Sequence, residues 1–187
     1  LKKTVVLIGI EGRAEPGQAG FDTHFRQALS EHLRKECREA LLDETAGAIV
    51  KPPPRLASGQ IDGFSLAMVG RPRGVNFFVI GSLTDARFLD EKTGFWLWKK
   101  TRYRLRVALR LEIVDSASGT KAFDESLWEE SIVDEMRYEE LKEAGGIPLS
   151  EMAPVTGRLL QEAGLKTCEV LRSQPWRGFV TAVDRNR

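Results

Sequence analysis

The alternation of apolar and polar positions predicts a strand and then a helix at the start of the chain. Residues 4–10 are almost all apolar and mostly β-branched, which is typical of a strand covered on both faces. A Gly- and Pro-rich stretch follows. From Phe21 to Leu41, apolar residues recur at helical spacing, with Asp22 or Thr23 available as the N-cap. We therefore expect a first long helix along this stripe.

Three consecutive prolines at 52–54 separate this first part from the rest of the chain. Proline fits neither a central strand nor a helix interior, so residues 45–60 are predicted to form a connector. A short edge strand at 48–51 and a short helical turn at 61–69 are the elements expected in this region.

Three strands are predicted next, at 75–88, 95–115 and 121–134, joined by turns that glycine and aspartate favour. The turn between the first two strands is expected at 89–94. In the second strand, apolar residues alternate strictly with a row that is mostly arginine. This pattern predicts an antiparallel meander with one core face and one arginine face.

The last part of the chain predicts a short acidic helix at 137–144, a long amphipathic helix capped by Ser150 and ended by Pro175, and a strand at 176–183. Together the elements predict the α+β class, with a single domain over residues 1–187. We expect a mixed β-sheet with a long antiparallel hairpin meander and two long helices packed on one face. Whether the natural protein is longer is left open.

Composition excludes several classes of protein. Of 187 residues, 42% are hydrophobic and 29% are charged, and the formal net charge is +1. This balance provides no overall field to attract a polyanion, and the longest apolar runs fall short of the ~20 residues that cross a bilayer. The apolar run near Leu1 resembles the start of a signal peptide but stops at Glu11 without a cleavage site. Leucine at position 1 fits a fragment boundary or an N-terminus left after removal of an export signal.

A phosphate-binding loop is the first candidate chemistry. Gly12 and Gly17 have the spacing of such a loop, between a predicted strand and a predicted helix. Gln18 and Ala19, however, stand where that motif needs the lysine that pairs with phosphate and the hydroxyl that holds Mg²⁺. We therefore expect no nucleotide and no other cofactor.

Metal and catalytic motifs are equally incomplete. His24 and His32 are the only histidines, eight residues apart on one predicted helix, and the chain has no C-x-x-C pair. Solvated strand and helix faces account for the carboxylates, and no G-x-S-x-G nucleophile elbow is present. We expect no metal site, no catalytic residues and no enzymatic activity, with an unrecognised hydrolase as an alternative.

The two cysteines, Cys37 and Cys168, lie on or beside the apolar stripes of the two long helices. If these helices pack side by side, the sulfurs come within range of a disulfide, which would form in an exported protein. The other interpretation is two separate buried thiols that act as small hydrophobic side chains. The sequence leaves both open.

A row of basic residues is the most conspicuous local feature and suggests nucleic acid as one partner. The next segment, 121–151, carries ten acidic residues against three basic ones. With a one-residue bulge at the turn, Arg110 would face Glu125 and Arg106 would face Glu129, so cross-strand ion pairs account for much of the row. We therefore expect no nucleic-acid binding. The basic row consists of Lys99, Lys100, Arg102, Arg104, Arg106 and Arg110.

Aromatic side chains gather at the first predicted hairpin. They either pack back on the domain or present an adhesive surface to a partner, since aromatic residues and arginine are enriched in interface cores. We expect the second, because the hairpin is long for the helices available to cover it. The predicted partner-binding residues are Phe88, Trp96, Trp98, Arg102 and Arg104.

Three segments resemble a family of bacterial envelope domains: 74–85, which reads GVNFFVIGSLTD, 111–120, which reads LEIVDSASGT, and 174–180, which reads QPWRGFV. The pattern looks like the middle domain of the flagellar assembly protein T family. It is also similar to the N-terminal domain of TolB and to the periplasmic domain of the curli secretion channel.

The resemblance implies a non-enzymatic domain in the periplasm or at the outer membrane, with its signal sequence removed and a lipid anchor upstream left open. Such a domain binds other envelope proteins, or further copies of itself, during assembly of a flagellar, secretion or Tol-like machine. The alternatives are a nucleic-acid-binding module that uses the basic strand 99–110 and the hydrolase mentioned above.

Overall fold

The computed structural model describes residues 2–10, 20–45, 50–95 and 100–175. Five strands form one sheet in the order β2-β1-β3-β4-β5. β1 is parallel to β2 and β3, whereas β4 is antiparallel to both of its neighbours, β3 and β5. The predicted α+β class and mixed sheet are therefore confirmed. The elements are β1 (Lys3–Ile10), α1 (Phe21–Glu36), β2 (Ala40–Leu42), α3 (Gly63–Gly70), the 3-10 turn η1 (Arg71–Arg73), β3 (Phe77–Thr93), β4 (Lys100–Asp115), β5 (Lys121–Val133), α4 (Glu135–Glu143) and α5 (Leu149–Ser173).

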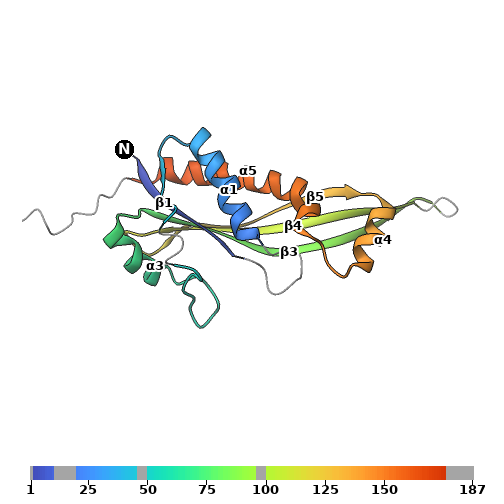
Figure 1. The fold of residues 1–187 in the computed structure, drawn as a ribbon, viewed down its shortest axis with the longest axis horizontal. Coiled ribbons are helices and arrows are strands. Elements are labelled where there is room, and N and C mark those ends of the chain that lie inside the picture. The colour runs from blue at the N-terminus through green and yellow to red at the C-terminus, as the bar shows by residue number, and fades with distance from the viewer. Residues whose placement is uncertain (1, 11–19, 46–49, 96–99, 176–187) are drawn as a thin grey trace, which may run out of the picture.

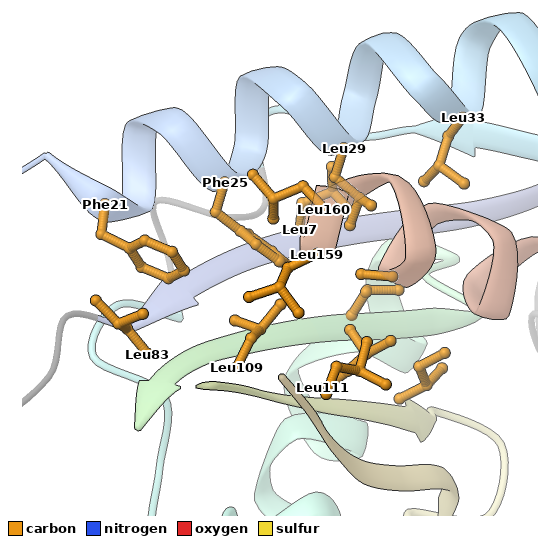
Figure 2. Close-up of a cluster of buried hydrophobic side chains, with 14 of the residues drawn as sticks. Leu7, Phe21, Phe25, Leu29, Leu33, Leu83, Leu109, Leu111, Leu159 and Leu160 are labelled. Carbon is orange, nitrogen blue, oxygen red and sulfur yellow. The ribbon is translucent and has the colours of Figure 1, made fainter. Parts of the chain in front are cut away.

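Helices cover the two faces of the sheet unequally. The long helices α1 and α5 lie together on one face, as predicted, and α3 covers part of the other face at one end of the molecule (Figure 1). Between α1, α5 and the sheet lies the main core, to which Phe25, Leu109 and Leu159 belong (Figure 2). Leu66 of α3 and Phe78 of β3 belong to a smaller core on the opposite face. Burial of each such side chain contributes about 1.5–3 kcal/mol relative to exposure.

The first long helix is shorter than the sequence pattern predicts. α1 ends at Glu36, and Ala40–Leu42 leave the helix to form β2, which pairs with the start of β1. The N-cap is Gly20, so Asp22 lies inside the first turn. A three-residue edge strand is too short for its apolar pattern to be told from one more helical turn, and pairing with β1 decides between them.

The connector and the short helix follow the prediction in part. α3 corresponds to the turn predicted at 61–69, and the Asp62 side chain accepts a hydrogen bond of 3.1 Å from the Ser65 backbone N–H at its start. Of the edge strand predicted at 48–51, Val50 and Lys51 are not in a strand, and the other two residues lie outside the described ranges.

The first hairpin is longer than predicted. β3 continues through the segment expected to be a turn as far as Thr93, which pairs with Lys100. Glu91 pairs with Arg102 in this stretch, and opposite charges on facing strand positions favour pairing over a turn. The segment predicted to be the turn is therefore strand as far as Thr93.

The second hairpin has a different register from the predicted one. The register shift lies between Ile113 and Val114 of β4, not at Gly119. As a result, Arg106 pairs with Glu130 and Arg110 with Ser126, one residue further along β5 than predicted.

The C-terminal helices also differ from the prediction in their ends. α4 corresponds to the predicted acidic helix, and α5 begins after Pro148, with Ser150 in its first turn instead of at its N-cap. The strand predicted at 176–183 lies outside the described residues. In the ranges that are described, no helix has the length and apolar character needed to cross a membrane.

Candidate partner-binding surface

Beyond the end of β1, the strands β3, β4 and β5 continue as a long three-stranded ribbon (Figure 1). β1 pairs with β3 only as far as Ile10 and Ser82, whereas β3 pairs with β4 as far as Thr93. One side of this ribbon faces α5 and α4. We call the other side the open face, which comprises Arg87, Leu89 and Glu91 of β3, Arg102, Arg104, Arg106 and Arg110 of β4, and Asp124, Trp128, Glu130 and Ile132 of β5.

Ion pairs across the strands organise the centre of the open face. Arg104 donates hydrogen bonds to Glu91 at 2.5 Å and to Glu130 at 3.2 Å, and Arg106 donates to Glu130 at 2.7 Å. The hydrogen bond from Arg106, and then that from Arg104, lowers the pKa of Glu130 below its ordinary value. Arg104, for which the sequence pattern named no partner, is therefore paired on both sides. Arg102 is exposed and has no ion pair among the described residues.

A second group of charges lies nearer to the β4–β5 turn. Arg110 contacts both carboxylate oxygens of Asp124, at 2.7 and 2.8 Å, and Lys121 donates to Asp124 at 2.7 Å. Lys121 also lies 2.5 Å from the buried Glu112. The hydrogen bonds from Arg110 and then Lys121 lower the pKa of Asp124 from its ordinary value near 3.8 to about 2.

Replacing Asp124 with asparagine should therefore lower stability in a pH-dependent way. Because the pKa of Asp124 is lower in the folded chain than in the unfolded chain, the carboxylate stabilises the fold above about pH 4, and this contribution is lost as the pH falls towards 2. The free energy of unfolding in urea should separate wild type from Asp124→Asn at pH 6 and bring them together near pH 2. The neighbouring variant Glu125→Gln is the control. An Asp124→Asn effect that is equal at both pH values would contradict the ion-pair assignment.

The apolar part of the open face comes from β5. Trp128 is 58% exposed and Ile132 is 76% exposed, and both point to the same side because they lie four residues apart on one strand. The Arg106 guanidinium lies over the Trp128 ring, 4.7 Å from its centroid. An exposed tryptophan beside arginines has the composition of a binding hot spot.

The described members of the predicted partner-binding set, Phe88, Arg102 and Arg104, lie on two different sides of the ribbon. The ring of Phe88 is half-buried on the side covered by the helices. It lies edge-on to the ring of Tyr138 of α4, with the two ring centroids 5.2 Å apart. The ring of Tyr138 in turn stacks on that of Tyr103, with the two ring centroids 4.0 Å apart. Arg102 and Arg104 lie on the open face. The predicted residues Trp96 and Trp98 fall outside the described residues.

Sequence reasoning missed Trp128 and Ile132, although a signal for them exists. Both residues alternate with Leu127, which is buried in the main core. Alternation along β5 therefore places them on the opposite side from the core.

The described part of the chain offers little for a metal or cofactor. Within it, no group of three or more His, Cys, Asp or Glu side chains is placed to hold a metal ion. A groove of about 500 Å³ beside the open face is lined by Arg55, Arg110 and Glu112 among others. Its charged groups are engaged by neighbours, since Arg110 binds Asp124 and Glu112 lies against Lys121.

Comparison with known proteins gives a match to the fold alone. No family model matches the sequence, including one for the flagellar assembly protein T family, and no curated protein matches it significantly. Among solved structures, the chain is similar to the hypothetical protein CT253 from Chlamydia trachomatis, with 15% sequence identity and a TM-score of 0.60. The match covers 93% of this chain and 100% of that one.

Weaker similarities extend to PelC, solved as a dodecamer from Paraburkholderia phytofirmans, and to TolB from Acinetobacter baumannii. PelC is 10% identical with a TM-score of 0.46, over 87% of this chain and 88% of that one. TolB is 10% identical with a TM-score of 0.39, over 92% of this chain and 28% of that one.

Proposed function

We propose that this chain is a non-enzymatic domain of the bacterial cell envelope that acts by binding another envelope protein, or a second copy of itself, through the open face of its sheet. The envelope location rests on the sequence resemblance described above. The binding role rests on one structural observation, which is the exposed Trp128 stacked under Arg106 on a part of the sheet that none of the described helices covers. A large aromatic side chain left in solvent contributes little to folding and is available to a partner.

The charge distribution favours a protein over a nucleic acid as the partner. Binding to phosphates requires cations that are free to replace counterions. Arg104, Arg106 and Arg110 are instead held by carboxylates of β3 and β5. Paired charges at the centre of this face, beside exposed apolar side chains on its edge strand, give the mixed polar and apolar composition of a protein interface.

Photo-crosslinking in the natural host would test the proposal. A photoreactive amino acid at position 132, on the open face, should give adducts with an envelope protein or with a second copy of the chain. The same group at Leu165, which is 50% exposed on α5, is the matched control and should give few adducts. Adducts in similar amounts at both positions, or fractionation of the protein with the cytoplasm, would contradict the proposal.

Trp128→Ala should weaken the association found in that way by roughly 30-fold or more, the change expected for removal of a hot-spot side chain. The midpoint of thermal unfolding should shift by only a few degrees, because Trp128 is largely exposed in the free domain. Titration of the crosslinked partner with purified wild type and with Trp128→Ala would measure the first effect. If Leu165→Ala weakens binding as much as Trp128→Ala does, the open face is not the interface.

A further inference from the structure

Two cysteines from opposite ends of the sequence lie in the same part of the core. Cys37 is the C-cap residue that directly follows α1, and Cys168 lies in the C-terminal part of α5. They are 1% and 3% exposed, and both belong to the main core between the helices and the sheet. They are free thiols in the structure.

Two contacts between α1 and α5, one before and one after Cys168 along α5, place the two cysteines at the same level of the interface between these helices. On one side, the helices approach so closely that a methyl group at Gly164 would lie 2.3 Å from Cδ2 of His32. On the other side, Arg172 donates a hydrogen bond of 3.1 Å to the Glu36 carbonyl oxygen. Position 168 lies midway between 164 and 172, and Cys37 directly follows Glu36.

The Cys168 thiol lies near that of Cys37 in this interface. Burial raises the pKa of the Cys168 thiol to about 12, and a hydrogen bond with Cys37 adds to the shift. A thiol that stays protonated at neutral pH is a poor nucleophile. Oxidation is therefore expected while the chain is still folding, when both cysteines are accessible.

We propose that Cys37 and Cys168 form a disulfide that joins the end of α1 to α5 in the exported protein. This proposal rests on the envelope location proposed above. The oxidant is a reactive disulfide of a low-molecular-weight thiol or of a thiol oxidase. The thiolate of one cysteine attacks that disulfide and releases the first thiol, and the second cysteine then attacks the mixed disulfide and releases the second. Two cysteine thiols are oxidised, the oxidant is reduced to two thiols, and these carry the two protons.

The bond would close a loop of more than a hundred residues and so restrict the unfolded chain strongly. In the chain-entropy model such a long loop gives one of the larger stabilising effects of a disulfide. Reduction of the bond should lower the midpoint of thermal unfolding by roughly 10 °C for a domain of this size.

The first arm of the test uses purified protein, unfolded and then refolded in a mixture of oxidised and reduced glutathione. Mass spectrometry should show the loss of two hydrogens and a peptide that contains both Cys37 and Cys168. Reductant should lower the unfolding midpoint of wild type but not that of the Cys37→Ala/Cys168→Ala variant. Two alkylatable thiols in the refolded native protein would overturn the proposal, whatever the location of the protein.

The second arm traps thiols in cells of the natural host with acid before alkylation. The proposal expects both cysteines to be protected in the native protein. A bond that forms on refolding but is absent in cells would contradict the exported location and, with it, the native disulfide. Failure of the first arm, in contrast, leaves the envelope location untouched.

Discussion

Replacing Phe25 with alanine should lower the free energy of unfolding by about 3–5 kcal/mol, the cost of removing a large aromatic ring from a packed core. Phe25 is fully buried on α1 and points into the layer between the helices and the sheet (Figure 2). Its ring lies against Gly81 of β3, where a methyl group would come within 2.1 Å of Cε2. The alanine variant therefore loses the contact between α1 and the central strands. Urea unfolding followed by circular dichroism would measure the change.

Two further variants make the Phe25 prediction specific. Phe64→Ala removes the same side chain from a position that is 63% exposed, so its cost should stay within about 1 kcal/mol. Gly81→Ala should destabilise wild type, because the Phe25 ring must move to admit the methyl group, and should cost less in the Phe25→Ala background. Equal costs of Gly81→Ala in the two backgrounds would contradict the packing of Phe25 on Gly81.

Replacing Asp22 with alanine should cost about 1.5–3 kcal/mol, the loss expected when a buried, charged hydrogen-bond acceptor is removed while its cationic partners stay partly exposed. The Asp22 side chain is 4% exposed and accepts a hydrogen bond of 2.8 Å from the backbone N–H of Gly9. It also forms ion pairs with Arg26, at 3.1 Å, and with Lys51. The alanine variant leaves the Gly9 N–H without this acceptor and the two cations without their counter-charge.

The comparison of Asp22→Ala with Asp22→Asn separates these two contributions. Asparagine keeps an oxygen for the Gly9 N–H but removes the negative charge. Asp22→Asn should therefore lower the free energy of unfolding, but by less than Asp22→Ala does. Glu44→Gln is the control, because the ion pair of Glu44 with Arg34 is exposed and should contribute no more than about 1 kcal/mol. If asparagine costs as much as alanine, the hydrogen bond to Gly9 contributes nothing measurable.

At the candidate surface, the sequence predicted the sides on which β4 residues lie but not the side on which Phe88 lies. Alternation in β4 correctly placed Leu105 and Leu109 in the core and the arginines on the other face. Phe88 was predicted to bind a partner because of its position near the hairpin tip. The register of β3 shifts between Leu83 and Asp85, and this bulge moves Phe88 to the helix-covered side. A bulge of one residue reverses every side chain beyond it.

For the arginine row, the sequence predicted that ion pairs form but not which residues form them. Opposite signs on β4 and β5 correctly indicated cross-strand pairing. The partners named from the sequence were wrong by one residue, because the register depends on where the shift lies, and the shift is near Val114 instead of Gly119. The sequence pattern named no partner for Arg104, because it considered only β5. The extension of β3 to Thr93 supplies Glu91 from the other side.

The sequence by itself determined the elements with long, regular periodicity, which are β1, β4 and α5, and with them the α+β class. These follow from the local alternation of apolar and polar residues, which each segment carries alone. Only the tertiary structure decided that Ala40–Leu42 form an edge strand, that the first hairpin continues to Thr93, and that Trp128 stands exposed under Arg106. Each of these depends on which strands pair and in which register. Pairing is a contact between segments far apart in the chain, so no single segment encodes it.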